Sequence, residues 1–276
     1  SKNSYFNNMK NLFIILSLLI ASPSFSQPKE VIFGEFSDKE IQMTSYALDK
    51  EAKAVVLYDK GKSRFYETNN YNNRYNDNRS NNNNNRHGNN NRYNNNNNRY
   101  EIRFTRHRRI KIFDNSESKH AEVSIPYYVD GYRKTEVIKS IEAITYNSKD
   151  GLLIEKKLDP STIYEEQISE QLFEKKFVFP DVQDGSILEL RYVLETPFYF
   201  NLPDWNFQDK IPTLYSEYQL SLIPFYEYKF LLQGVTKFDY QSSIVSEGKR
   251  RWGTVSKSYG QDVGNGVEFQ DYIHTY

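Results

Sequence analysis

The chain has no cysteine among its 276 residues. It therefore forms no disulfide within itself, offers no thiolate to a metal ion and has no cysteine nucleophile of its own. An excess of charge of one sign is also lacking, because 36 Lys and Arg residues balance 36 Asp and Glu residues. A neutral balance gives no overall electrostatic attraction to nucleic acid or to an anionic membrane surface.

The patterns that commonly mark catalytic and metal sites are missing too. The four histidines do not occur in pairs at the i, i+2 or i, i+4 spacing typical of metal ligands. No Gly-x-Ser-x-Gly motif occurs, and Gly260, Gly264 and Gly266 lack the GxGxxG spacing of a phosphate-binding loop. We therefore expect this chain to contain no catalytic residue, no cofactor site and no metal ligand.

One apolar run, Leu12–Ile20, is nine residues long and follows the basic start Met9-Lys10. Small residues then lead to Gln27, which is the layout of a cleavable secretory signal, and the run is too short to span a bilayer stably. We predict an extension and signal peptide over residues 1–26. The mature chain is expected to be exported, periplasmic or outer-membrane-associated, without a transmembrane segment. No cysteine follows the run, so a lipoprotein is not expected.

Aromatic residues are abundant, at 16% of the chain, with 23 Tyr and 18 Phe. They favour pleated, half-buried surfaces, and short alternating segments between turn signals favour a β-sandwich. We predict an all-β-dominated fold of two consecutive antiparallel sandwich-like units, with one or two short helices. The first unit covers residues 27–195, and the second covers residues 196–276 and is expected to be cut short at its C-terminal end.

Two segments give specific expectations for the strands. Ala54–Tyr58 predicts a strand, and Asp59-Lys60-Gly61-Lys62 predicts a tight turn after it. Glu101–Asp114 alternates well, but Arg106 and Arg108 occupy the parity of its apolar residues. Charged residues at those positions predict a bulge or a solvent-exposed middle of the strand.

Two further segments predict the short helices. The first lies within residues 37–54, where charged and apolar residues mix. The second is Ser161–Gln171, which has an acidic first turn and a candidate N-cap at Ser161 or Thr162.

An asparagine-rich tract that repeats Asn-Asn-Arg-Tyr occupies residues 67–100. Its interleaved Tyr and Arg side chains are able in principle to stack on single-stranded nucleic acid. The predicted export and the neutral remainder of the chain argue against that function, and we expect no nucleic-acid partner. Such a composition buries too little apolar area to offset the entropy of ordering, so we expect a disordered loop.

A series of segments carries a resemblance to a known family. In order they are "AVVLYDKG", "RHRRIKIFD", "IEAITYNSKDG", "KKFVFPDVQDGSILELRY" and "LPDWNFQDKIPTLYSEYQLSLIP". The series, from Ala54 to Gln233 without the Asn-rich tract, resembles the N-terminal domain of unknown function in bacterial transglutaminase-like envelope proteins. The resemblance implies an exported β-sandwich module without chemistry of its own. It also implies a downstream papain-like core with a Cys-His-Asp triad.

Three hypotheses for function follow. The first is a non-catalytic scaffold or partner-binding arm for a downstream core of the same polypeptide or for another envelope protein. The second is an independent glycan- or peptide-binding module. The third is the arm of an active cysteine protease or transglutaminase whose catalytic domain lies beyond Tyr276.

The loop Thr196–Pro212 holds the candidate contact residues for a ligand. Its aromatic side chains are able to form a platform for sugar or peptide, or else to fill the seam between the two β units. Because aromatics bury large areas and dominate cores, we favour the seam. The residues are Phe198, Tyr199, Phe200, Trp205 and Phe207.

Overall fold

The structure is a computed structural model, and one compact unit covers Val31–Tyr276. The expected signal peptide and almost all of the Asn-rich tract lie outside the described residues, so both stay predictions. The described residues are 30–68, 99–116, 118–130, 135–200, 202–229, 231–234, 237–252, 256–258, 261–263 and 267–276.

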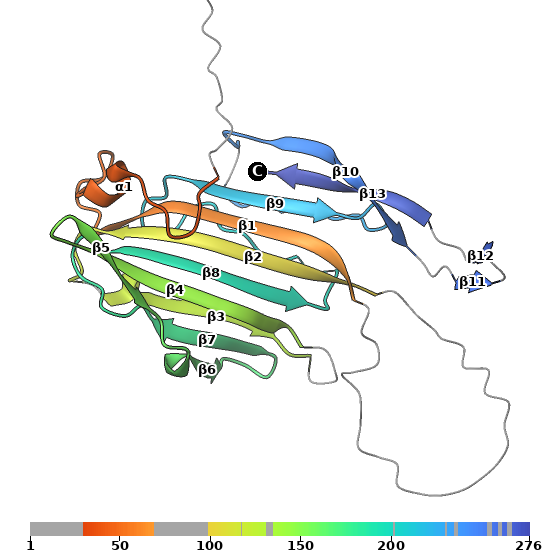
Figure 1. Ribbon diagram of the computed structural model, residues 1–276, viewed down its shortest axis with the longest axis horizontal. Coiled ribbons are helices and arrows are strands. Elements are labelled where there is room, and N and C mark those ends of the chain that lie inside the picture. Colours follow the sequence, from red (N-terminus) through yellow and green to blue (C-terminus); the bar gives the residue numbers. More distant parts are fainter. Residues whose placement is uncertain are drawn as a thin grey trace, which may run out of the picture. The chain divides into compact units, whose positions relative to one another are not determined.

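Eight strands form the main sheet, in the order β10-β13-β9-β1-β2-β8-β4-β5 (Figure 1). Neighbouring strands are antiparallel except β1 and β9, which run parallel. The all-β class is confirmed. Strands from both sides of the expected 195/196 boundary share this one sheet, and the division into two units stays a prediction. The strands are β1 (Ala54–Thr68), β2 (Arg99–Ile112), β4 (Val137–Lys149), β5 (Leu152–Lys157), β8 (Ile187–Thr196), β9 (Ser216–Leu222), β10 (Ser242–Trp252) and β13 (Val267–Thr275).

A second, three-stranded sheet has the order β3-β7-β6, and two short strands, β11 and β12, form a separate antiparallel pair. In the three-stranded sheet both pairings are antiparallel. The strands are β3 (Glu122–Tyr128), β6 (Tyr164–Gln167), β7 (Leu172–Val178), β11 (Ser256–Ser258) and β12 (Gln261–Val263).

Helix α1 (Asp38–Gln42) confirms the short helix expected within residues 37–54. A capping box starts it, in which the Glu40 carboxylate accepts a 2.8 Å hydrogen bond from the backbone N–H of Ser37. A short 3-10 turn, η1 (Ser118–His120), precedes β3.

The prediction of a helix over Ser161–Gln171 is wrong. A 3-10 turn, η2 (Pro160–Thr162), is capped by Asp159 and leads directly into β6. A short helix without a packed apolar face is marginal, whereas pairing with β7 satisfies the backbone of β6 along its length.

The prediction of a tight turn at Asp59-Lys60-Gly61-Lys62 is also wrong. Strand β1 continues through these four residues and pairs with β2 before, along and after them. Asp59 and Gly61, the two turn-forming residues, make contacts with distant segments instead. Asp59 is buried and accepts hydrogen bonds from Arg106. Gly61 lies against the Trp205 ring, where an added Cβ would come within 2.4 Å of the ring atom Cζ3.

The bulge predicted from Arg106 and Arg108 occurs in the partner strand. The register between β1 and β2 shifts around Leu57. A one-residue insertion reverses which face later side chains occupy, so Asp59 shares a face with Arg108, its pairing partner. The side chains of Arg106 and Arg108 are only 25% and 19% exposed. The middle of β2 is therefore not solvent-exposed, which was the alternative to a bulge.

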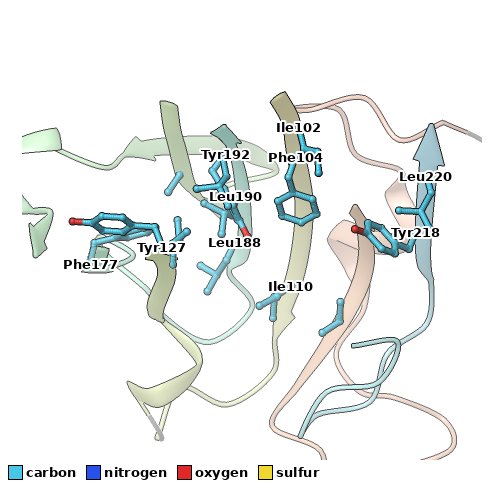
Figure 2. Close-up of a cluster of buried hydrophobic side chains, with 14 of the residues drawn as sticks. Ile102, Phe104, Ile110, Tyr127, Phe177, Leu188, Leu190, Tyr192, Tyr218 and Leu220 are labelled. Carbon is cyan, nitrogen blue, oxygen red and sulfur yellow. The ribbon is translucent and has the colours of Figure 1, made fainter. Parts of the chain in front are cut away.

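The main core lies on one face of the eight-stranded sheet, called here the inner face, and joins it to the three-stranded sheet. Even-numbered residues of β2 and β8 point to this face, as the two-residue period of a strand requires. Figure 2 shows them meeting side chains of β3, β7 and β9. The labelled residues are Ile102, Phe104, Ile110, Tyr127, Phe177, Leu188, Leu190, Tyr192, Tyr218 and Leu220.

The opposite, outer face carries a smaller core. Ile144, Tyr146 and Ile187 are buried there under apolar residues of segment 31–49, which we call the N-terminal strap. Phe36 of the strap contacts Tyr146 edge-on at 4.6 Å between ring centroids. Both faces of β8 are therefore covered, which explains why nearly all of its residues are buried.

We expect that replacing residues 69–98 with an Asn-Gly turn will shift the melting temperature by only a few degrees. The ends of this segment already meet, because Thr68 and Arg99 are paired across β1 and β2. An Asn-Gly pair is a common two-residue connection in an antiparallel hairpin. Thermal unfolding followed by circular dichroism measures the shift. A drop above about 15 °C would contradict the expectation, since the segment would then contribute several kcal/mol.

Candidate functional site

A charged group lies within the apolar inner face, where β1 and β2 pair. Arg106 donates from Nε and Nη2 to the two carboxylate oxygens of Asp59, at 2.8 and 2.6 Å. Burial disfavours the charged guanidinium, but the hydrogen bonds and the charge of Asp59 outweigh burial and raise the pKa of Arg106. Two parallel hydrogen bonds to a carboxylate fix the orientation of both side chains.

Arg108, two residues further along β2, has a less complete set of partners. Its Nη2 donates to Asp209, which lies in the loop Thr196–Pro212, called here the aromatic loop. Its Nε lies 3.6 Å from Asp59, beyond hydrogen-bonding distance, and is buried without a hydrogen-bond partner among the described residues. Burial raises the pKa of Asp209, but the Arg108 charge and the Lys210 amide outweigh it, so the net direction is downward and the carboxyl is ionised near neutral pH.

A cavity of about 190 Å³ on the inner face lies between β2, β8, η1, β3 and the aromatic loop, and its lining includes Arg106, Arg108 and Asp209. Its apolar lining residues include Ile110, Ile125, Phe179, Leu188 and Leu190. Its charged and basic residues are Arg106, Arg108, Lys119, His120, Glu122 and Asp209. The cavity brings cationic and apolar side chains together on the inner face, so we take it as the candidate binding site.

Trp205, the central residue of the predicted aromatic contacts, packs inward. Its ring stacks on Tyr218 with centroids 5.2 Å apart and planes at 12°. Its Nε1 donates to the Ser216 hydroxyl at 3.1 Å, and the Arg106 guanidinium lies 4.9 Å from the ring centroid. These contacts place Trp205 over β1, β2 and β9, next to the charged group.

The other four predicted contact residues divide between core and surface. Tyr199 and Phe207 pack against the main core, and Phe198 is half-buried. Phe200 is 70% exposed and contacts Phe198 and Tyr199, with centroids 6.1 and 6.0 Å away. The structure therefore joins Phe198, Tyr199 and Phe200 in one group and places Trp205 on Tyr218. Whether any of them contacts a ligand stays a prediction.

A second charged group lies on the outer face, beneath the strap. Arg109 donates to the Glu189 carboxylate oxygen Oε1 from Nη2 at 2.6 Å and from Nε at 3.1 Å. The same oxygen lies 2.8 Å from Nε2 of His107. The Arg109 and Glu189 side chains are 1% and 0% exposed, so this is a fully buried ion pair.

The strap satisfies the remaining polar atoms of this pair. Gly34 donates its N–H to Oε2 of Glu189 at 2.8 Å. Arg109 donates from Nη1 to Glu40 at 2.7 Å and from Nη2 to the carbonyl oxygen of Ile32 at 3.0 Å. The buried charges therefore fasten the strap to the sheet.

We expect the strap to weaken at acidic pH through Glu40. Burial raises the pKa of Glu40, but hydrogen bonds from Ser37 and the Arg109 guanidinium outweigh it and hold the pKa below the ordinary 4.5. A carboxyl with a lowered folded-state pKa stabilises the fold above its unfolded-state value, and this contribution disappears as pH falls through the folded-state value. Glu40→Gln removes the titrating group.

Urea unfolding at pH 7 and pH 3 measures this effect. The wild-type chain and Glu40→Gln are expected to differ by about 1 kcal/mol at pH 7 and by less at pH 3. A difference that stays constant between the two pH values would contradict the assignment.

Sequence reasoning did not identify the inner-face cavity. The available signal was the placement of Arg106 and Arg108 on the apolar parity of a strand. That signal shows that the arginines need partners, but Asp59 and Asp209 come from distant segments, 47 and 101 residues away in the sequence. Among the described residues, no group of three or more His, Cys, Asp or Glu side chains is arranged to hold a metal ion.

Comparison with known protein families identifies the family of this chain. Residues 98–257 match the model of a family described as a domain of unknown function with a solved structure, DUF3857, and this match covers more than half of the sequence. The chain belongs to the DUF3857 family. The expectation of an uncharacterised, β-rich domain is thereby confirmed for DUF3857, and the transglutaminase-like context stays a prediction.

Other comparisons add little to the DUF3857 assignment. No curated protein matches the sequence. A solved structure of a putative protease from Parabacteroides distasonis matches with a TM-score of 0.41 and 13% identity. The match covers 81% of this DUF3857 chain and 35% of that protein, so the chain spans about a third of its length. Within the described part of the chain, no helix is long and apolar enough to cross a membrane.

Proposed function

We propose that this DUF3857 chain is a non-catalytic, exported arm of a transglutaminase-like envelope protein. It acts as a scaffold or partner-binding module for a Cys-His-Asp core carried by the same polypeptide, or for another envelope protein. The arm works in the periplasm or at the outer membrane, after removal of the signal before Gln27. This proposal joins the family membership to the motifs from Ala54 to Gln233 that resemble such proteins.

The observation that carries the proposal is how the buried charges are used. Glu189 and Arg109 direct their polar atoms at His107, Gly34, Ile32 and Glu40, all within the chain. A catalytic carboxylate or cation instead needs a polar atom directed at its substrate. The outer-face charges of this chain hold its own segments together, which suits a rigid scaffold.

The coding sequence beyond Tyr276 gives the first test. A scaffold for a core on the same polypeptide requires a Cys-His-Asp core there, and a reading frame without one would refute that form of the role and leave only the role for another envelope protein. Where the core is present, the full polypeptide is compared with a form that lacks residues 31–276. We expect the deletion to impair partner capture or core activity while the core stays folded by circular dichroism. Unchanged capture and unchanged activity would also refute the role.

An independent glycan- or peptide-binding module is the second candidate, favoured by the exposed Phe200 ring beside Phe198 and Tyr199. Phe200→Ala tests it without disturbing the core, because the ring is mostly exposed. Binding of a peptide or glycan panel by the wild-type chain, lost in Phe200→Ala, would support the module. Equal binding by both folded proteins would exclude this surface.

A further inference from the structure

One of the arginines that line the inner-face cavity has a buried side-chain donor without a hydrogen bond among the described residues. Arg108 lines the cavity, and its buried Nε–H has no hydrogen-bond partner among the described residues. Buried donors are nearly always paired, and a guanidinium offers donors in a fork that matches a carboxylate. The geometry of Arg108 therefore favours an oxyanion as its partner.

The walls of the cavity restrict what carries that anion. Leu188 and Leu190 of β8 line it together with Ile125 and Phe179, so apolar side chains lie beside the charged ones. The volume of about 190 Å³ is somewhat larger than a cavity of about 150 Å³ that accepts benzene, and smaller than the pockets of about 300 Å³ or more that hold drug-sized ligands. One apolar side chain of moderate size fits such a space.

The charge around the cavity is arranged so that one carboxylate is exchangeable. Asp59 binds Arg106 through both oxygens and is buried. Asp209 binds Arg108 from a loop, and its side chain is 36% exposed. Of the two acids, Asp209 is thus the one that a second carboxylate is able to displace. Lys119 and His120 add basic groups to the lining, and Glu122 adds one acidic group.

We propose that this cavity binds the C-terminal residue of a peptide, with the terminal carboxylate on Arg108 and an apolar side chain between the two sheets. The proposal extends the partner-binding role to a ligand class, and it rests on the cavity alone. Its test is therefore separate from the search for a downstream core.

N-acetyl-leucine and its neutral amide, N-acetyl-leucinamide, are a matched pair of probes. They share the apolar side chain and differ in the carboxylate. We expect the whole chain to bind the acid about tenfold more tightly than the amide in a titration followed by nuclear magnetic resonance, because a charge-assisted bidentate contact is lost in the amide. Rising salt is expected to weaken binding of the acid.

Two variants change the binding in opposite directions. Arg108→Met is expected to lower the affinity for the acid about tenfold and to leave the affinity for the amide unchanged. Asp209→Asn removes the competing carboxylate and is expected to raise the affinity for the acid severalfold. The control is Arg191→Met, which removes the same charge from an exposed pair with Glu142 outside the cavity lining.

Several outcomes would overturn the proposal. Equal binding of acid and amide would exclude recognition of the carboxylate, and inorganic phosphate binding as tightly as N-acetyl-leucine would exclude the apolar subsite. Should Arg108→Met fail to fold, Asp209→Asn still decides the matter, because unchanged or weaker binding by that variant would contradict displacement of Asp209.

Discussion

Glu189→Ala is expected to destabilise the protein by about 3–5 kcal/mol, since breaking a buried ion pair leaves its partner's charge uncompensated. Arg109, whose side chain is 1% exposed, would lose its buried carboxylate and keep only the partly exposed Glu40 as an acidic partner, and the N–H of Gly34 would lose its acceptor. The strap is fastened through the same carboxylate, so we also expect it to open. Urea unfolding measures the free energy, and hydrogen exchange of residues 31–49 reports on the strap.

A matched control shows whether burial is the cause. Glu142 pairs with Arg191 on the outer face, but these side chains are 45% and 52% exposed. Removing Glu142 by substitution with alanine is expected to cost less than about 1 kcal/mol, as is usual for exposed ion pairs. A similar loss from both substitutions would contradict the argument.

The double variant Arg109→Met/Glu189→Leu separates burial of an unpaired charge from loss of the pair itself. Replacing a buried ion pair with apolar residues of similar volume is often neutral for stability. We therefore expect the double variant to recover more than half of the loss seen in Glu189→Ala. Failure to recover would mean that the hydrogen bonds to Glu40, Ile32 and Gly34 matter more than the charge.

The buried role of Glu189 shows where prediction from sequence ends. Within "SILELRY" it occupies the parity opposite Leu188 and Leu190, where a polar residue usually faces water. The face is covered instead by the strap, whose Glu40 is separated from Arg109 by 69 positions. Alternation predicts which residues share a face, but a distant segment decides whether that face is exposed.

The same limit explains the turn that was wrongly expected in β1. Asp and Gly are turn-forming residues by local preference, so the prediction at Asp59-Lys60-Gly61-Lys62 followed local rules. The structure uses Asp59 to pair with Arg106 and Gly61 to admit the Trp205 ring. Both partners are remote in sequence. By contrast, the β class depends on aromatic content and alternation, which are local, and it was predicted.

The close contact between Gly61 and Trp205 leads to the other large expected effect. Trp205→Ala should destabilise the protein by about 3 kcal/mol, at the lower end for a large aromatic because the ring is partly exposed. Its stacking on Tyr218 and its hydrogen bond to Ser216 are lost together. The loss would make Trp205 a residue of the seam, whereas a folded variant of wild-type stability that no longer binds sugar or peptide would make it part of a platform.

Gly61→Ala tests the contact from the other side. The new Cβ would lie 2.4 Å from Cζ3 and 2.6 Å from Cε3 of the Trp205 ring, so the ring must move, and we expect a cost of about 1–3 kcal/mol. In the Trp205→Ala background the clash is absent, and the same substitution should cost less than about 0.5 kcal/mol. Urea unfolding of the four proteins gives the coupling energy. Additive losses would show that the ring does not lie over Gly61, and the proposed packing of the aromatic loop onto β1 would then be wrong.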